Sequence, residues 1–131
     1  MVEFAIFGLI FFILIFAIAE FGLILFDKAM MTNASREGAR AGIVFRATPD
    51  GEYNPLTVTE IETVIRRYLG DYLVSFKPSN ATVSIPAICT GAGAELRVNV
   101  SYQYDFLVLP RLVKSLAGSI PLAAETVMRC E

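Results

Sequence analysis

An unbroken apolar segment near the amino terminus constrains this chain more than any other feature. Residues 4–19 read FAIFGLIFFILIFAIA and contain no charged or strongly polar side chain. Glu20 interrupts the segment, and residues 21–26 continue it as FGLILF. A membrane-spanning helix needs about 17–25 predominantly apolar residues, so the sequence predicts a helix that can cross a bilayer. Glu20 is unusual there, because a carboxylate near the bilayer centre costs about 2.5 kcal/mol or more, although one near the end of a span can reach the interface.

A cleaved secretory signal is the main alternative for this segment. Such signals begin with basic residues and carry an apolar stretch of about 7–15 residues before a cleavage site of small residues. Here no basic residue precedes the apolar segment, which is also too long. The first basic residue is Lys28, and the positive-inside rule would then hold the carboxyl-terminal side in the cytoplasm. Because the rest of the chain has the features of an exported protein, we expect that a short basic leader preceded Met1 and was removed.

The helical pattern continues well beyond the apolar segment. No proline occurs from Val2 to about Phe45, which predicts one helix of about 44 residues and about 66 Å, twice the thickness of the hydrocarbon core. We therefore divide the chain into a long helix, residues 1–46, and a head domain, residues 47–131. Within the helix, residues 2–26 form the membrane or filament-core half and residues 27–46 the outer half.

Small side chains are concentrated in the outer half of this helix. They allow close packing either of the chain's own sheet or of helices from other subunits. We prefer the first interpretation for the outer half and the second for residues 2–26. The small residues are Ala29, Ala34, Ser35, Gly38, Ala39, Ala41 and Gly42.

The head begins with a loop and an amphipathic helix. Residues 46–56 contain two prolines around an Asp-Gly turn and are predicted to be a loop. Two overlapping capping-box patterns, beginning at Thr57 and Thr59, then precede apolar residues at helical spacing. They predict a helix over residues 58–73.

Three strands are predicted after this helix. Residues 81–85 form a short strand that Pro86 ends, and residues 95–106 alternate strictly between apolar and polar side chains. Residues 107–117 are predicted to be a loop around Pro110 with a short helix, and residues 120–128 the last strand. The fold class is therefore α+β: a long hydrophobic helix with a head of one helix and an antiparallel sheet of three to four strands.

Two cysteines flank this predicted sheet. Cys89 precedes the long strand and Cys130 follows the last one. A disulfide between them would stabilise the head by about 3–4 kcal/mol in the chain-entropy model and would indicate an oxidising compartment. The alternative is a pair of free buried thiols, and we favour the disulfide.

Composition weakens most enzymatic and nucleic-acid-binding hypotheses. The 131 residues include no histidine, which removes the commonest catalytic base and metal ligand. Two cysteines alone cannot hold a structural zinc ion. A net charge of −2 is unlike the basic face of a nucleic-acid-binding protein. We therefore expect no enzymatic activity, no cofactor, no metal and no nucleic-acid partner.

Three motifs that follow one another along the helix resemble the TadE-like pseudopilins of tight-adherence pili, a type IVc-like family. They are the segment from Val2 through Glu3 to Ala5, the segment Glu20-Phe21-Gly22, and the segment TNASREGAR. The last contributes the family signature residues Thr32, Asn33, Arg36, Glu37, Gly38 and Arg40. The alternating strand, Pro110 and the terminal segment from Met128 to Glu131 also fit the family.

The resemblance implies partners and a location. A prepilin peptidase removes the leader, the precursor lies in the inner membrane with its head outside, and an assembly machine driven by an ATPase moves it into an extracellular filament. A glutamate at the fifth mature position pairs with a neighbour's amino terminus and sets the register. Glu3 is third here, so either two mature residues are absent from this sequence or cleavage occurs elsewhere. Glu20 is a second candidate for intersubunit pairing, with Lys28 of another chain.

The sequence thus predicts a pilin-like structural subunit that forms a homo-oligomeric filament for surface attachment. Glu3, Phe4 and Glu20 would set the subunit register. Two alternatives are a minor pseudopilin that primes or caps assembly and a single-span periplasmic binding module that is never extracted. The residues expected to pack in the filament core are Ile6, Phe7, Leu9, Phe11, Phe12, Leu14, Phe16, Phe21, Leu23 and Phe26.

Overall fold

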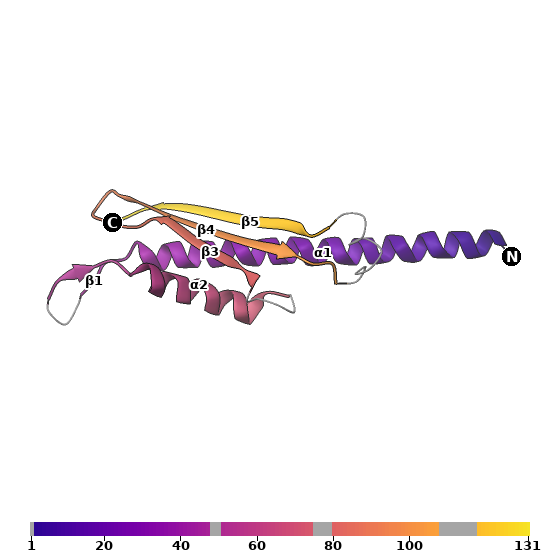
Figure 1. The fold of residues 1–131 in the computed structure, drawn as a ribbon, viewed down its shortest axis with the longest axis horizontal. Helices are drawn as coiled ribbons and strands as arrows, with labels where there is room; N and C mark the ends of the chain where they lie inside the picture. The colour runs from indigo at the N-terminus through magenta and orange to yellow at the C-terminus, as the bar shows by residue number, and fades with distance from the viewer. Residues whose placement is uncertain (1, 48–50, 75–79, 108–117) are drawn as a thin grey trace.

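One helix runs through the molecule and organises the fold (Figure 1). The structure is a computed structural model that describes residues 2–47, 51–74, 80–107 and 118–131. Helix α1 extends over Val2–Gly42, 41 residues, and confirms the predicted long helix. It ends three residues earlier than Phe45, because the chain turns at Ile43 and Val44 to enter a short strand.

A two-stranded ribbon replaces the loop predicted over residues 46–56. Strand β1 (Arg46–Ala47) pairs in antiparallel orientation with β2 (Tyr53–Asn54). Gly51 has a φ of +83°, a conformation that suits glycine and allows the chain to reverse between the strands. The prediction of a loop was wrong because the sequence indicated the turn but not the pairing of the residues on either side of it.

Helix α2 (Val58–Tyr72) closely matches the predicted helix over residues 58–73. Its first turn uses the capping box that begins at Thr57, whose N–H donates to Glu60 Oε2 over 2.8 Å. Ile61, Ile65 and Leu69 are buried along one side of α2 and contribute to the hydrophobic core. The helix therefore packs against the rest of the molecule through the apolar face that its sequence pattern indicated.

The sheet is antiparallel in the order β3-β4-β5. Strand β4 (Glu95–Tyr104) is central. Its apolar side chains from Leu96 to Tyr104 are buried and alternate with outward-facing polar side chains, as predicted. Strand β5 (Ile120–Arg129) pairs with it along its full length. Strand β4 ends at Tyr104 and not at residue 106, because its partner strand begins opposite Tyr104, at Ile120.

Strand β3 (Thr82–Ala87) is longer than predicted and includes Pro86. The prediction that Pro86 ends the strand was wrong. The pairing of β3 with β4 shifts register between Ser84 and Ala87, and β3 lies at the edge of the sheet. Proline is tolerated at such irregularities and edges because no ladder hydrogen bond requires its missing N–H.

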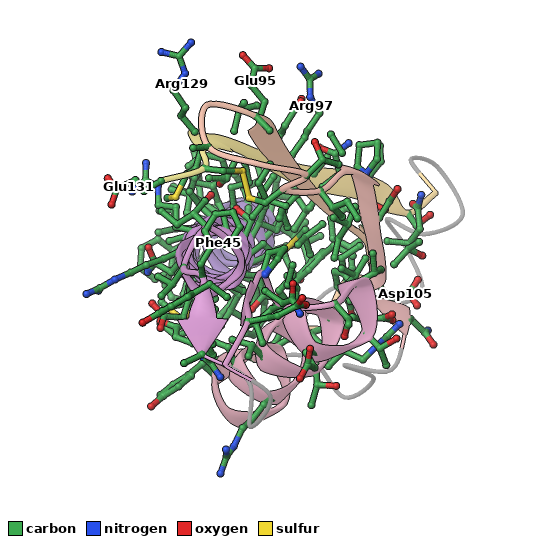
Figure 2. All side chains as sticks on the ribbon, turned by 90° about the vertical axis from the view of Figure 1, so that its left-hand side faces the viewer. Phe45, Glu95, Arg97, Asp105, Arg129 and Glu131 are labelled. Atoms are coloured by element: carbon green, nitrogen blue, oxygen red, sulfur yellow. A yellow bond between two sulfur atoms is a disulfide. The ribbon has the colours of Figure 1, made fainter. Side chains whose placement is uncertain are left out.

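The head packs along the outer half of α1. The sheet lies on one side of α1 and α2 on another, whereas the amino-terminal part of α1 extends beyond both (Figure 1). The labelled side chains Glu95, Arg97 and Arg129 point away from α1 on the outer face of the sheet (Figure 2). Most of the predicted loop over residues 107–117 lies outside the described residues. The α+β prediction is confirmed with three strands in the main sheet.

Candidate functional site

The amino-terminal part of α1 is an uncovered apolar surface. Phe4 is 84% exposed and Phe7 71%, and the apolar side chains that follow them up to Ile18 are also exposed. Helix α1 is long and apolar enough to cross a membrane by length and composition, and only 6% of its apolar window is buried. The core helix of a soluble protein would instead be mostly buried. The exposed residues from the predicted packing set are Ile6, Phe7, Leu9, Phe11, Phe12, Leu14, Phe16, Phe21 and Phe26, whereas Leu23 packs partly against the head core.

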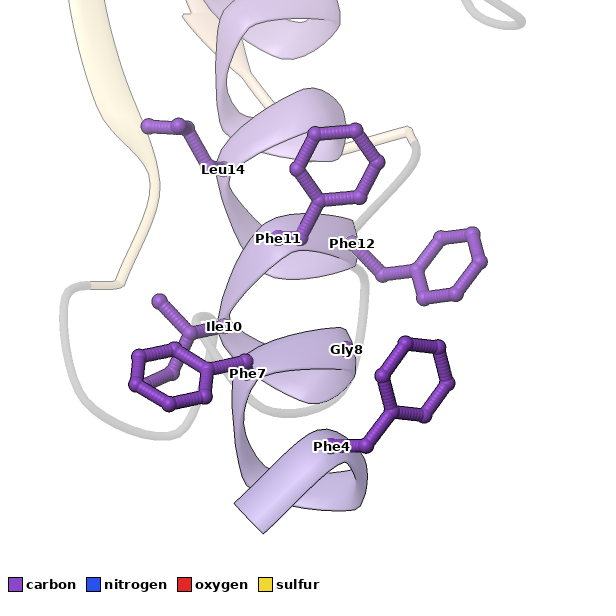
Figure 3. A pocket seen from close by; sticks show the side chains of 7 residues that line it. All are labelled: Phe4, Phe7, Gly8, Ile10, Phe11, Phe12 and Leu14. Atoms are coloured by element: carbon purple, nitrogen blue, oxygen red, sulfur yellow. The ribbon is translucent and has the colours of Figure 1, made fainter.

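Gly8 lies in an apolar hollow on this surface (Figure 3). The rings of Phe4 and Phe12 project on the same side of α1 as Gly8, one turn below it and one turn above it. An added Cβ at Gly8 would meet no atom within 4 Å. The hollow is therefore open to an apolar group from outside the chain. The side chain of Glu3 lies outside what the structure describes.

Glu20 is the first residue of α1 that the head covers. It is only 3% exposed, and its Oε1 accepts hydrogen bonds from the Tyr104 hydroxyl over 2.6 Å and from the Leu107 N–H over 2.8 Å. Burial, followed by the hydrogen bond to Glu20, raises the pKa of Tyr104, so its hydroxyl stays protonated and donates. The structure thus gives Glu20 partners within its own chain.

Lys28, the intersubunit partner considered for Glu20, is also used within the chain. Its Nζ donates a hydrogen bond to the carbonyl oxygen of Ala123 in β5. Both residues of the predicted pair between Glu20 and Lys28 of another chain thus have partners within their own chain.

Asp27 is a second buried carboxylate, two turns further along the covered face. It is fully buried, and its Oδ1 accepts a hydrogen bond from the Val74 N–H over 3.0 Å. Its Oδ2 has no hydrogen-bond partner among the described residues. Sequence reasoning missed this role, although the spacing of seven between Glu20 and Asp27 places both on one helix face.

Ser35 makes a third polar contact on the covered face. It is fully buried, and its Oγ is hydrogen-bonded to Thr126 Oγ1 of β5 at 2.6 Å. Glu20, Asp27 and Ser35 are the buried polar residues among those described. Each one joins α1 to a different segment of the head.

The signature segment divides between the two sides of α1. Thr32 donates a hydrogen bond from its hydroxyl to the Lys28 carbonyl oxygen, and Gly38 is buried against α2. A Cβ at Gly38 would lie 2.4 Å from Ile65 Cγ1. This contact fits the preferred intrachain interpretation of the small residues of the outer half. The other signature residues are exposed: Asn33, Arg36, Glu37 and Arg40.

The disulfide between Cys89 and Cys130 is present, as predicted. Their Cα atoms are 5.8 Å apart, and both residues are buried. The backbone N–H of Cys130 also donates to the Ala94 carbonyl oxygen over 2.8 Å. The end of β5 is thereby fixed to the turn that precedes β4.

Together these elements define an α+β, pilin-like layout: a long apolar helix whose outer half carries a small head. Residues 1–40 match the sequence model of the family described as TadE-like protein. The match covers the part of the chain that carries the three motifs, and it confirms the resemblance drawn from them. No curated protein and no solved structure gave a significant match to the chain.

Proposed function

We propose that this chain is a structural pilin-like subunit of an extracellular filament used for surface attachment. Its apolar helix anchors the precursor in the inner membrane and later packs against the helices of other copies in the filament core. The observation that carries the proposal is that the described apolar side chains of residues 4–19, which are all but that of Ala5, are exposed around the helix. A helix that is apolar all round is stable in lipid and in a protein bundle alike.

The head fits the outside of such a filament. The outer face of its sheet is mostly polar and includes an ion pair of 3.1 Å between Arg97 and Glu125. Its disulfide matches an oxidising environment outside the cytoplasm. TadE-like pilins are generally non-enzymatic and belong to the pilus or the cell envelope, which agrees with a role in assembly.

Two further assignments follow from the resemblance. Glu3 pairs with the amino terminus of a neighbouring subunit, because a carboxylate within an apolar bundle needs a compensating charge. A prepilin peptidase and the pilus assembly machinery act on the precursor.

The proposal is tested by shearing intact cells that produce the chain. The sheared material and the membranes are compared by immunoblot, and the intact mass of the sheared chain is measured to fix its amino terminus. We expect the chain to dominate the sheared filaments. If it stays in the membranes while another small pilin is released, the proposal fails. A deletion strain then separates the alternatives, since loss of filaments indicates a minor pseudopilin and normal filaments indicate an anchored module.

A substitution in the hollow at Gly8 separates membrane anchoring from helix packing. Gly8→Leu adds an apolar side chain where an open surface now lies between Phe4 and Phe12. Lipid accepts the extra side chain, whereas close helix packing does not. We expect normal precursor in the membrane and fewer sheared filaments. Ile10→Leu, a change of shape without added bulk on the same segment, is the matched control and should leave filaments unchanged.

A further inference from the structure

The two edges of the three-stranded sheet differ in how well they are protected. Strand β3 forms one edge, contains Pro86 and shifts register between Ser84 and Ala87. Arg66 Nη1 also donates a hydrogen bond to the carbonyl oxygen of Ala81, just before this strand. A short strand, a proline and an irregular register all hinder an edge from pairing with another chain. Strand β5 forms the other edge, and it pairs with β4 in regular register over all ten of its residues.

Every second residue of β5 directs its backbone groups away from β4. In an antiparallel pair, residues that bond to the partner strand alternate with residues whose N–H and C=O point outward. Cys130 is of the first kind, because it exchanges hydrogen bonds with the turn that precedes β4. Ala123 is then of the second kind, and its carbonyl oxygen accepts a hydrogen bond from Lys28 Nζ of α1. The same outward orientation recurs at Glu125, Val127 and Arg129.

The carboxyl-terminal half of this edge is open. Pro121 has no N–H to offer, and Lys28 occupies the Ala123 carbonyl, so the amino-terminal half is protected. No described residue forms a hydrogen bond with the outward backbone groups of residues 125, 127 and 129, and no other labelled element lies on the outer side of β5 (Figure 1). Val127 is 46% exposed, an apolar residue on a mostly polar face. A regular open edge of this kind accepts a further strand.

The side chains of this segment indicate that the strand that fits is a second copy of β5. Glu125 and Arg129 lie two residues before and two residues after Val127, so all three share the outer face. When two copies pair in antiparallel orientation about Val127, each Glu125 faces an Arg129 and the two valines face each other. Opposite charges directly across a strand pair stabilise it, whereas like charges destabilise it. Glu125 also pairs with Arg97 at 3.1 Å, but both side chains stay about half exposed and within reach of a second cation.

Other registers fit less well. Pairing centred on Glu125 would place two glutamates opposite each other, and pairing centred on Arg129 would do the same with two arginines. Pairing centred on residue 126 would place each Glu125 opposite a valine. The charges therefore favour a single register.

We propose that the heads of two copies pair through the open edges of β5, over residues 125–129, in antiparallel orientation and centred on Val127. The contact is isologous, because each copy uses the same residues. Strand β5 runs along α1, so the pairing makes the two α1 helices point in opposite directions (Figure 1). Copies in one membrane or one filament point the same way, whereas copies on filaments from two facing cells meet in this orientation. This location rests on the proposed function, but the pairing itself does not.

Crosslinking of the full oxidised chain in detergent micelles tests the pairing and its register. A short thiol-specific crosslinker is added to Val127→Cys and, separately, to an equal mixture of Glu125→Cys and Arg129→Cys. We expect covalent dimers from both, severalfold more than from the control Ala123→Cys. Glu125→Cys alone and Arg129→Cys alone should give little dimer, because the two copies of each residue would lie about 14 Å apart along the strands.

Charge reversal in Val127→Cys separates specific pairing from random collision. Adding Glu125→Arg places like charges opposite each other and should lower the yield of dimer severalfold. Adding Arg129→Glu as well restores opposite charges and should restore the yield. Both side chains are exposed, so the head should stay folded, and an unchanged near-UV circular dichroism spectrum checks this.

The outcomes separate this proposal from the proposed function. Equal yields from all the cysteine variants, no dimer from any of them, or no restoration by the second reversal would overturn the pairing. Efficient crosslinking of Glu125→Cys alone and of Arg129→Cys alone would indicate parallel strands and would overturn the antiparallel register. The proposed function stands or falls on the sheared filaments, which none of these results measures.

Discussion

The close approach of α1 and α2 at Gly38 predicts an unusual effect of adding one methyl group. In Gly38→Ala the new Cβ would lie 2.4 Å from Ile65 Cγ1 and 2.6 Å from Ile65 Cδ1. Ile65 is fully buried, so it can yield only by disturbing the packed core. Overpacking of this kind costs about 1–3 kcal/mol. Alanine in place of glycine in a helix gains about 1 kcal/mol, so we expect a net loss of about 1 kcal/mol in the free energy of unfolding.

Gly70→Ala in α2 is the matched control. Gly70 is exposed, and an added Cβ would meet nothing within 4 Å. This variant keeps only the helical gain of about 1 kcal/mol. The same substitution should therefore lower the free energy of unfolding at residue 38 and raise it at residue 70. The stability of both variants is measured by urea unfolding of the full oxidised chain in detergent micelles. The near-UV circular dichroism of tyrosine reports the unfolding. A difference of about 2 kcal/mol separates the midpoints by about 0.7–2 M urea.

A stabilising Gly38→Ala would refute the reasoning. It would mean that α1 and α2 are further apart than the structure has them, and the intrachain role of the small residues would be lost. Gly42→Ala provides a graded comparison, because its nearest neighbours are terminal methyl groups, Leu96 Cδ2 at 2.6 Å and Ile61 Cδ1 at 2.7 Å. Such groups move more easily, so we expect a smaller loss than at Gly38.

Three further predictions use the same unfolding assay. Tyr104→Phe removes the hydroxyl that donates to Glu20 and should cost about 1.5–3 kcal/mol, so an unchanged midpoint would contradict the buried hydrogen bond. Thr57→Ala should cost about 1 kcal/mol at neutral pH, whereas Thr59→Ala should not, because only the first capping box forms. The hydroxyl and then the N–H of Thr57 lower the pKa of Glu60, so this contribution is present above the usual carboxyl range and is lost as the pH falls through the lowered pKa. Reduction of the disulfide, which joins residues 41 apart, should cost about 3–4 kcal/mol, and a loss below about 1 kcal/mol would contradict the chain-entropy argument.

The elements that depend on local patterns could be predicted from the sequence. The absence of proline before residue 49 was sufficient for α1, and strict alternation was sufficient for β4. The signals for α1 and β4 lie within the elements that they predict. The Cys89–Cys130 disulfide joins residues 41 apart, but it could be favoured because these are the two cysteines of the chain and they flank the predicted sheet.

The contacts that depend on distant partners could not be predicted in the same way. Glu20 and Tyr104 are 84 residues apart, and nothing near either residue indicates the other. The ladder between β1 and β2 and the passage of β3 through Pro86 also depend on which strand lies beside them. For the buried carboxylates, the sequence indicated the helix face but not the partners. Glu20, Leu23 and Asp27 share one face of α1, and two acidic residues on a partly apolar face indicate that the head covers it.

The three buried polar residues of α1 explain how the head keeps one position along a helix whose apolar packing alone would permit several. Small and apolar residues recur along the covered face, so a slip of one turn, about 5.4 Å, would still bury apolar surface. Glu20 binds the segment at the end of β4, Asp27 the segment after α2, and Ser35 the middle of β5. One such slip would separate all three from their partners at once, and a carboxylate that stayed covered would be buried without these hydrogen bonds, which is strongly unfavourable. The polar contacts therefore fix how much of α1 stays bare, and this length is what a subunit needs to hold constant if both a bilayer and a filament are to accept it.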